Sequence, residues 1–277
     1  MVVWNIFQLN FELLMTESGR AMMKRLVGCH LLIASLLVVA CSYLLCRKGG
    51  AAQPTPENGQ YLRNLTMTST LLAADFVPDG NLSKKVWKDA PRVTMDRDRF
   101  GKKRLPELET QVASRWTPGY VYFAYWCRYR SLYVFTGEDP TKERPNLCIR
   151  DVVEAFINPQ PGRFRHYYEF EMAPNNQWWD IEINLDKNGN IDWDSHFDHA
   201  TRIDAAHKIW TLEMRIPVKP MNVDAIHAGD EWRLNHYRSD GQGDDSQKHY
   251  MAWSALPDGS SGSFHQPACF GIVRFVK

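Results

Sequence analysis

Aromatic rings, an amide, a guanidinium and an imidazole gather in the last third of this chain, over residues 230–277. Asn235 and Arg238 follow an alternating apolar pattern, Trp253 stands between a polar loop and a Gly/Ser loop, and His265 lies in a second loop. A sugar ring has apolar C–H faces and a rim of hydroxyl groups, so it is bound by exposed aromatic faces and paired hydrogen-bonding side chains. These residue types fit such a site, and they are also typical of a β-sandwich core.

The spacing of Asn235 and Arg238 decides whether they can act together. Residues three apart on a regular strand point to opposite faces of a sheet, so these two share a site only where a bulge or a strand end intervenes. A Ser-Asp-Gly run follows Arg238 directly and predicts a strand end there. The structural alternative is that Arg238 pairs with a carboxylate, such as Glu154 or Glu169.

Three further tryptophans are candidate sugar platforms. Trp178 and Trp179 follow an Asn-Asn-Gln run, which predicts a loop between strands. Adjacent residues of a strand face opposite ways, so one of the two would be buried and the other would be available to a ligand. Trp116 precedes a Thr-Pro-Gly turn and is a similar candidate. The alternatives are that Trp253 is a core-edge residue and that His265 caps a loop.

The elements that would position these residues are short strands. Apolar residues repeat with period two or cluster in short runs close to Gly, Pro, Asn or Asp, and the body of the chain sustains no long helical repeat. This predicts an all-β fold, an antiparallel β-sandwich of the immunoglobulin or jelly-roll type whose edge loops carry the site. The runs are residues 112–116, 121–126, 132–135, 153–157, 167–172, 181–185, 210–216, 232–236 and 271–276.

Length and charge limit the classes of partner. The 277 residues, 44% of them hydrophobic, can bury a substantial core. The 33 basic and 32 acidic residues give a formal net charge of +1, which provides no field for nucleic acid, so we exclude that partner. The cysteines show no C-x-x-C spacing of a zinc site. Cys127, Cys148 and Cys269 lie in the body, where an odd number leaves at least one unpaired.

The first 48 residues contain an export signal. Met22-Met23-Lys24-Arg25 is a positive segment, and an apolar run follows it. Val38-Val39-Ala40-Cys41 resembles the bacterial lipobox, in which the cysteine is lipid-modified and becomes the new N-terminus, so Cys41 is the predicted lipidation site. The alternative is an uncleaved membrane anchor, because residues 26–46 are mostly apolar and long enough to cross a bilayer. Either arrangement places the body in the cell envelope, held at the outer membrane or facing the periplasm.

The chain is accordingly divided into three parts. Residues 1–48 form an N-terminal extension with the signal or anchor segment, residues 49–69 form a flexible polar linker, and residues 70–277 form the sandwich domain. The folded structure is expected to start near Leu71, because apolar periodicity is absent before it. No internal repeat is apparent.

A series of short motifs occurs in a fixed order over residues 76–277. They are Pro78-Asp79-Gly80-Asn81-Leu82, Val86-Trp87-Lys88-Asp89-Ala90, Leu132-Tyr133-Val134-Phe135, residues 151–159, residues 167–171, Ala173-Pro174-Asn175, residues 210–217, residues 232–238, Ala252-Trp253-Ser254, Phe264-His265-Gln266-Pro267 and Phe270-Gly271. In this order they resemble the family 9 carbohydrate-binding modules and the wider group of family 9-like and DOMON-like sandwiches. The resemblance implies a β-sandwich that binds an oligo- or polysaccharide. In the family a pair of tryptophans sandwiches a sugar at a chain end, and no two tryptophans here match that pair.

No cofactor is predicted. Residues 186–192 carry oxygen donors at alternate positions, like a calcium loop, but their Asn-Gly pair is also the expected hairpin turn and no glutamate stands at the twelfth position. We therefore assign no metal to this loop. Calcium occurs in family 9 modules, so the resemblance leaves a structural ion elsewhere open.

The functional hypothesis is non-catalytic carbohydrate binding by an exported, membrane-tethered β-sandwich. The acidic residues fall in no recognisable catalytic setting, and nucleophile and phosphate-loop motifs are absent from the sequence. One alternative is an extracytoplasmic haem-binding redox domain, because related sandwiches hold haem through Met and His or Lys ligands. Another is a structural surface protein that docks other proteins. The candidate haem ligands are Met172, Met214 and Met251 with His236, His249 and His265.

Overall fold

The computed structural model describes residues 65–139, 142–187, 189–241 and 247–277. The predicted signal or anchor segment, the lipidation site Cys41 and most of the predicted linker lie outside these residues, so those assignments stay predictions. Among the helices in the described ranges, none is both long enough and apolar enough to cross a bilayer.

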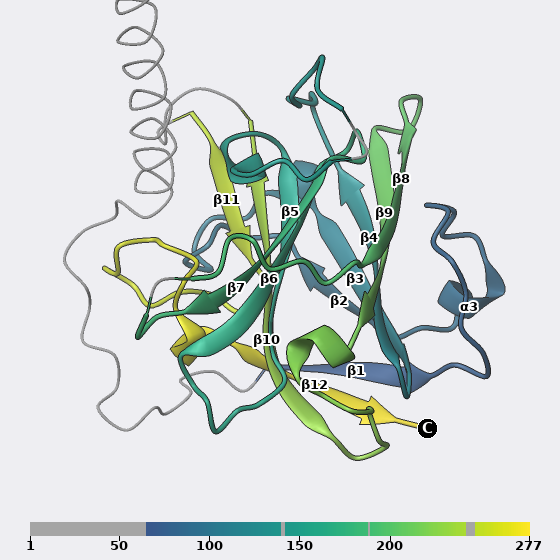
Figure 1. The fold of residues 1–277 in the computed structure, drawn as a ribbon. Coiled ribbons are helices and arrows are strands. Elements are labelled where there is room, and N and C mark those ends of the chain that lie inside the picture. Colours follow the sequence, from purple (N-terminus) through teal and green to yellow (C-terminus); the bar gives the residue numbers. More distant parts are fainter. Residues whose placement is uncertain (1–64, 140–141, 188, 242–246) are drawn as a thin grey trace, which may run out of the picture. The chain divides into compact units, whose positions relative to one another are not determined.

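The strands of the described ranges are hydrogen-bonded into one continuous twelve-stranded sheet (Figure 1). Its order is β7-β6-β5-β10-β12-β1-β3-β4-β9-β8, with β11 paired to β10 and β2 paired to β3. The strands are β1 (Thr66–Leu71), β2 (Arg92–Met95), β3 (Thr110–Thr117), β4 (Tyr120–Arg128), β5 (Val152–Asn158), β6 (His166–Met172), β7 (Trp178–Asn184), β8 (Asp198–Asp204), β9 (Ile209–Pro217), β10 (Glu231–Asp240), β11 (His249–Ala252) and β12 (Gly271–Val276). The helical elements are short: α3 (Lys85–Lys88) and the 3-10 turns η1 (Pro106–Leu108), η2 (Leu147–Ile149), η3 (Lys219–Met221) and η4 (Pro267–Cys269).

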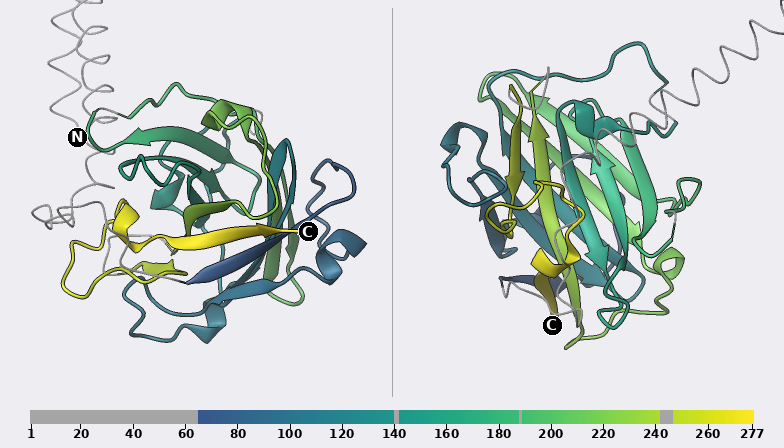
Figure 2. Two further views of the ribbon diagram at one scale, coloured as in Figure 1. Left: turned by 90° about the horizontal axis from the view of Figure 1, so that it is seen from below. Right: turned by 90° about the vertical axis from the view of Figure 1, so that its left-hand side faces the viewer.

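The sheet curls so that its two halves face each other, as Figure 2 shows from two directions. One half contains β5, β6, β7 and β10, the other contains β3, β4, β8 and β9, and the adjacent strands β12 and β1 join them. The predicted all-β class is confirmed, with the layered arrangement of a sandwich. Neighbouring strands are antiparallel except at β1, which pairs in parallel with both β12 and β3. The expectation of a purely antiparallel sheet was therefore wrong at this strand.

Strand β1 also corrects the predicted linker, because it begins at Thr66, inside residues 49–69. Its sequence is mostly Thr and Ser, with Met67 as a buried apolar residue. The Ser69 side chain is buried as well, and its hydroxyl accepts a hydrogen bond of 2.9 Å from Ser114 of β3. A strand that is hydrogen-bonded on both sides can bury small polar side chains, and such a strand lacks the apolar alternation that marks strands in a sequence.

The core lies between the two halves and is built by alternate residues of the strands. On β4 the inward side chains are Val121, Phe123, Tyr125 and Cys127, all fully buried. Opposite them β5 and β6 contribute Val153, Ala155, Ile157, Tyr168, Phe170 and Met172, and β9 contributes Trp210, Leu212, Met214 and Ile216. Each large apolar side chain buried in this way contributes about 1.5–3 kcal/mol to folding. The Cys127 and Cys269 side chains are buried, and Cys127 is a free thiol.

Two local predictions were wrong. Residues 132–135 do not form a strand. Tyr133 pairs with Asp151: the Tyr133 amide donates to the Asp151 carboxylate (2.8 Å), and the Tyr133 carbonyl accepts from the Asp151 amide (2.9 Å). The Phe135 ring packs against the Arg144 guanidinium, which lies 3.2 Å from the ring centroid. Trp178 and Trp179 lie at the start of β7 rather than in a loop. In both places the pairing of a neighbouring segment decided the local structure, and the residues themselves did not encode it.

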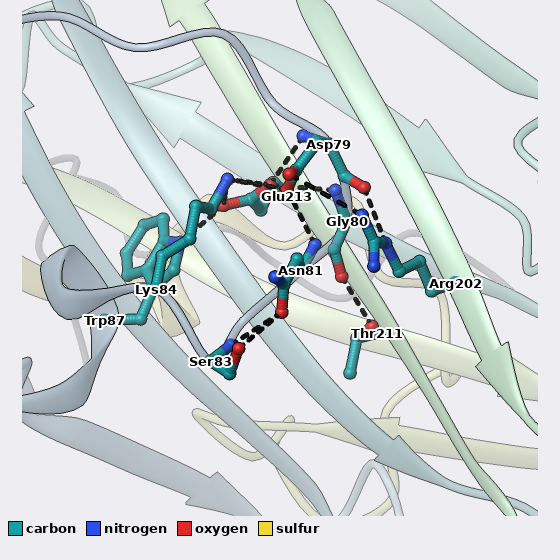
Figure 3. A network of polar contacts seen from close by, with 9 residues as sticks. All are labelled: Asp79, Gly80, Asn81, Ser83, Lys84, Trp87, Arg202, Thr211 and Glu213. Carbon is teal, nitrogen blue, oxygen red and sulfur yellow. Dashed lines mark hydrogen bonds and ion pairs between the residues drawn. The ribbon is translucent and has the colours of Figure 1, made fainter.

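A buried carboxylate, Glu213 of β9, fixes the segment before α3 on the outside of the sheet. The amides of Asp79 and Gly80 donate to its Oε2 at 2.8 and 2.9 Å, and the indole Nε1 of Trp87 donates to its Oε1 at 2.5 Å. The Lys84 ammonium lies 2.7 Å from Oε1 and 2.8 Å from Oε2. Figure 3 shows these donors converging on Glu213 from the turn and from α3. Glu213 is fully buried, and both oxygens are satisfied.

The turn reaches Glu213 because Gly80 lacks a side chain. Its φ is 73°, in the left-handed region, and a Cβ would lie 2.9 Å from the Cγ of Arg202 and from the Thr201 carbonyl carbon. The Gly80 carbonyl accepts a hydrogen bond of 2.8 Å from Thr211. The predicted Asp-Gly turn therefore packs closely against β8 and β9, and only glycine fits at position 80.

Replacing Glu213 with Gln should destabilise the fold strongly. The Gln amide keeps one acceptor but turns an NH₂ group toward backbone and side-chain donors, and it leaves Lys84 with only Asp79 as a partner. We expect the free energy of unfolding in urea to fall by about 3–5 kcal/mol. Glu231→Gln is the matched control, because Glu231 and Arg274 form a half-exposed pair at 2.6 Å and should change stability by less than about 1 kcal/mol. Equal losses in both variants would contradict the assigned role of Glu213.

Candidate functional site

Arg238 is fully buried inside the sandwich and serves the fold. Its guanidinium donates to the carbonyls of Leu108 (2.8 Å) and Arg128 (2.7 Å), and it pairs with Asp240 at 2.8 Å. Strand β10 continues to Asp240, so the predicted strand end at Arg238 was wrong. The structural alternative is the correct one, although the partner is Asp240 and neither Glu154 nor Glu169.

Asn235 and Trp116 are also built into the structure. Asn235 is fully buried, and its side-chain amide donates to the Ser254 carbonyl (2.8 Å) and accepts from the Ser254 amide (2.9 Å). Trp116 is 3% exposed, and its indole donates to the Val276 carbonyl at 2.9 Å. The unbroken pairing of β10 with β5 places Asn235 and Arg238 on opposite faces. The structure therefore does not bring these residues together as a ligand site.

The other tryptophans divide between the two faces. Trp253 is half-buried over Gly271, where an added Cβ would lie 2.6 Å from its ring, and it packs at the edge of the core, which agrees with its core-edge interpretation. Trp178 and Trp179 face opposite sides of β7, as predicted for adjacent strand residues. Trp178 packs inward against Phe197 at 5.4 Å. Trp179 is 5% exposed and lies opposite Glu171 on the outer face.

A different set of residues forms the best candidate site, on the outer face of β5, β6 and β10. Carboxylates and rings alternate there, because outward side chains of neighbouring strands line up in register. Glu154 lies opposite Glu171, Phe156 opposite Glu169, and Tyr237 opposite Glu154. The loops around β11 and η4 add rings at the border. We call this set the glutamate–aromatic face: Glu154, Phe156, Tyr167, Glu169, Glu171, Tyr237, Tyr250, Phe264 and His265.

The rings of this face form a continuous layer. Tyr237 and Phe264 stack at 4.1 Å and 10°, and Tyr250 meets Phe264 edge-on at 6.0 Å. Phe156 stacks on Tyr167 at 5.6 Å and lies 5.2 Å from the His265 ring. Tyr250 and Phe264 are half-buried, so their outer surfaces reach solvent. Phe264 offers an apolar ring at this border and Tyr250 a ring with a hydroxyl group, which suits the pair to contact a ligand with apolar and polar sides.

His265 is the sequence-predicted residue that does lie on this face. Its Nδ1 is 2.8 Å from the Tyr167 hydroxyl, and its Nε2 is 4.0 Å from the Glu169 carboxylate. Its side chain is 20% exposed, against 7% for Glu169. His265 therefore connects the solvent border to the buried carboxylates, although its contacts also fit the loop-capping alternative.

Two carboxylates of the face, Glu154 and Glu171, are held in an environment that disfavours their charge. Glu154 and Glu171 are 2% and 1% exposed. Burial raises the pKa of Glu171 to about 7. Burial, followed by the negative charge of Glu171, raises the pKa of Glu154 well above its ordinary value. Among the described residues, Oε1 of Glu154 and Oε2 of Glu171 have no hydrogen-bond partner. Buried oxygens of this kind are unfavourable unless a donor reaches them.

The candidate haem ligands lie in separate places. Met172 and Met214 fill the main core, whereas Met251 packs in a small cluster with Met95, Leu105 and Leu108. His236 is fully buried, its Nδ1 is 2.8 Å from the Tyr125 hydroxyl, and burial lowers its pKa to about 3. His249 is half-buried on β11, away from the core. The haem alternative thus stays a prediction that this arrangement does not favour.

Sequence reasoning missed the glutamates of the face as a group. Glu169 and Glu171 are spaced by two on a predicted strand, which places them on one face, and this was the available signal. Glu154 joins them only through the register of β5 with β6. That register is set by the core residues of the opposite face, and a single sequence does not reveal it.

The free energy of unfolding should fall as pH rises from about 4.5 to about 7. The pKa of Glu171 is about 7 in the folded protein and 4.5 in an ordinary carboxyl, so the unfolded chain loses this proton first. His236, whose pKa is lowered, acts in the opposite direction below pH 6.5. Glu171→Gln should flatten the fall by about 1–3 kcal/mol in urea titrations across this range. Glu231→Gln should leave the profile unchanged, and an unchanged profile in Glu171→Gln would refute the assignment.

Comparison with known sequences gives one relative of moderate similarity. No protein-family model matches the chain. A protein of Arthroderma benhamiae, described as an extracellular protein, is 29% identical over 155 residues, which are 50% of this chain and 64% of that protein. The chain therefore matches less than two thirds of this relative.

Comparison with solved structures identifies the fold. A presumed carbohydrate-binding protein from Bacteroides uniformis superposes with a TM-score of 0.61 and 16% identity, over 76% of this chain and 98% of that one. A family 9 carbohydrate-binding module from Caldicellulosiruptor kristjanssonii, in complex with cellotriose, gives 0.53 and 12%, over 76% and 94%. Its complex with glucose gives 0.52 and 12%, over 77% and 95%. The described part of this chain therefore has the fold of the family 9 carbohydrate-binding modules.

Proposed function

We propose that this protein is a non-catalytic carbohydrate-binding module that takes an oligo- or polysaccharide at the glutamate–aromatic face. The observation that supports this is the arrangement of half-exposed rings beside buried carboxylate oxygens that have no hydrogen-bond partner among the described residues. A sugar needs both features, because it has apolar C–H faces and hydroxyl donors on one small ring.

Different residues of the face would contact the apolar and the polar parts of the sugar. The outer surfaces of Tyr250 and Phe264 offer an apolar platform, and their orientation is held by the stack of Phe264 on Tyr237. Glu169, next to His265 at the solvent border, accepts hydrogen bonds from sugar hydroxyl groups. A hydrogen bond contributes about 0.5–1.5 kcal/mol net, so two bonds to this carboxyl group would account for a substantial part of the affinity.

The face favours neutral sugars over anionic ones. Glu154, Glu169 and Glu171 bring three carboxyl groups together, and a uronate or a sulfated sugar would add negative charge beside them. The structurally similar module from Caldicellulosiruptor kristjanssonii was solved with cellotriose and with glucose. Neutral β-linked oligosaccharides are therefore the first ligands to test.

The geometry supports binding rather than hydrolysis. Glycoside hydrolases place two carboxyl groups on either side of the scissile bond. Glu154 and Glu171 are side by side on paired strands, so both lie on the same side of any ligand. Incubation with the bound oligosaccharide should release no new reducing ends.

Export and tethering belong to the same proposal. The apolar segment before Cys41 and the polar residues after it would hold the sandwich outside the cytoplasm. A relative described as extracellular supports export. At the cell surface the module would keep the protein in contact with polysaccharide.

Removing the platform should abolish most of the binding. In calorimetric titration of the full chain against cellotriose and a panel of neutral and acidic oligosaccharides, Phe264→Ala and Glu169→Gln should each weaken affinity about 10–100-fold. Trp126→Ala is the matched control, because Trp126 is a half-buried ring on β4, in the other half of the sheet, stacked with Arg92 at 3.7 Å. It should bind like the parent chain.

The outcomes separate the competing functions. Equal losses in Trp126→Ala would place the ligand on the other half of the sheet. No heat with any glycan, together with a Soret absorbance band on purification, would favour the haem alternative. No heat and no colour would favour a protein-docking role. Thermal unfolding of each variant establishes that it is folded before binding is compared.

The anchor has a separate test. Mass spectrometry of the mature N-terminus should find a diacylglyceryl Cys41, with the preceding residues removed. Cys41→Ser should then release the protein from the membrane fraction. An unmodified Cys41 within a longer chain would refute lipidation and favour the uncleaved anchor.

A further inference from the structure

Arg99 lies at the border of the glutamate–aromatic face, in the segment that connects β2 to η1. Its backbone is hydrogen-bonded on both sides. The Arg99 amide donates to the Tyr250 carbonyl of β11 at 2.7 Å, and the Arg99 carbonyl accepts from the Leu256 amide at 2.7 Å. Strand β11 therefore holds this residue beside Tyr250, one of the two half-buried rings of the face. In this way a segment that is distant in the sequence adds an arginine to the candidate sugar site.

The guanidinium of Arg99 is fixed in place by packing. Its central carbon lies 4.6 Å from the centre of the Tyr250 ring, and an aromatic ring attracts a cation in this position. The fit to Gly262 is close, because a Cβ added there would lie 2.6 Å from the same carbon, 2.7 Å from Nη2 and 2.8 Å from Nε. Gly262 belongs to the Gly/Ser loop that leads into Phe264. The guanidinium is therefore held against both Tyr250 and the loop that carries Phe264.

The N–H groups of this guanidinium have no hydrogen-bond or ion-pair partner among the described residues. The acidic residues of its own segment have other partners: Asp96 pairs with Arg104 at 2.6 Å, and the Asp98 carboxylate accepts from two backbone amides of its turn at 2.8 and 3.2 Å. Arg99 is half-buried, so the outward side of the guanidinium is open to a ligand. A guanidinium has five N–H donors and no acceptor, so a ligand that fits it must provide acceptor atoms.

We propose that Arg99 donates paired hydrogen bonds to two neighbouring oxygen atoms of the bound saccharide, and that it thereby determines which sugars the face accepts. This inference rests on the proposed function, because it assumes that a saccharide contacts Phe264 and Glu169. A guanidinium presents two parallel N–H groups in one plane, and two adjacent hydroxyl oxygens of a sugar ring can accept both. The contacts with Tyr250 and Gly262 hold that plane in one orientation before the sugar arrives.

The donors and acceptors of the face then define the class of ligand. The carboxylate of Glu169 accepts hydrogen bonds from the ligand, whereas Arg99 donates them. A hydroxyl group both donates and accepts, so a ring with several hydroxyl groups suits both residues, and an amine or a purely apolar ligand does not. The substrate class is therefore a neutral saccharide that has two adjacent hydroxyl groups on one ring. A deoxy sugar that lacks one of these oxygens would leave an N–H group without its acceptor.

Calorimetric titration of the full chain with cellotriose tests the role of the guanidinium. Arg99→Ala should weaken the affinity about 10-fold, through the loss of two hydrogen bonds. Arg99→Lys keeps the charge but not the planar pair of donors, so it should weaken the affinity at least about 3-fold. Arg97→Ala is the matched control, because Arg97 is in the same segment and its side chain is 47% exposed, and it should bind like the parent chain. Parent-like affinity in Arg99→Ala or Arg99→Lys, or equal losses in Arg99→Ala and Arg97→Ala, would overturn the proposal.

Two glycines of the Gly/Ser loop separate the contact with Arg99 from a general effect on the loop. Gly262 and Gly259 have φ values of 78° and 73°, so alanine introduces similar backbone strain at either position. At Gly262 the new Cβ displaces the Arg99 guanidinium, whereas at Gly259 it meets no atom of the described residues within 4 Å. Gly262→Ala should therefore weaken cellotriose binding, and Gly259→Ala should not. In an Arg99→Ala background Gly262→Ala should cause no further loss, and a full further loss would contradict the role of Arg99.

Monodeoxy analogues of methyl β-cellobioside test the same contact from the side of the ligand. Removal of either of two adjacent hydroxyl groups should weaken binding to the parent chain and leave binding to Arg99→Ala unchanged. The same comparison with Arg99→Lys decides the matter if Arg99→Ala does not fold. Losses that are equal in the parent chain and in both variants would overturn the proposal.

The controls separate a failure of this inference from a failure of the proposed function. A parent chain that binds no glycan would overturn both. A parent chain that binds cellotriose, loses affinity in Phe264→Ala and Glu169→Gln and keeps it in Arg99→Ala would overturn only the role of Arg99.

Discussion

The parallel pairing of β1 with β12 and β3 is the constraint on which the rest of the structure depends. This strand joins the two halves of the sheet, so the sheet curls and encloses a core between its inner faces. Its buried residues Met67 and Ser69 lie in register with Val273 and Phe275 of β12, and Ser69 also with Ser114 of β3. Because the first and last strands of the described residues are neighbours, the loops and sites between them are attached to one continuous sheet.

Carboxyl groups are buried on the outer faces of both halves of the sheet. The segments that cover these faces provide them with hydrogen-bond donors to different extents. On the half with β4 and β9, Glu213 receives backbone, indole and ammonium donors, and the second apolar cluster forms around Trp87. On the half with β5 and β6, Glu154 and Glu171 each have an oxygen that receives no hydrogen bond from the part of the chain that the structure describes. A fully satisfied carboxylate strengthens a fold, whereas incompletely satisfied ones mark places where a ligand can add donors.

The sequence by itself determined the all-β class, the strands with clear apolar alternation and the Asp-Gly turn at Gly80, because period-two burial and positive φ are local properties. It also singled out His265, which lies on the face proposed for sugar binding. The tertiary structure alone decided that Arg238, Asn235 and Trp116 are structural, that β1 belongs to the sheet, and that Glu154, Glu169 and Glu171 share one face. Those outcomes follow from which strands are neighbours and in what register, and pairing between distant segments leaves no local pattern in the residues it joins.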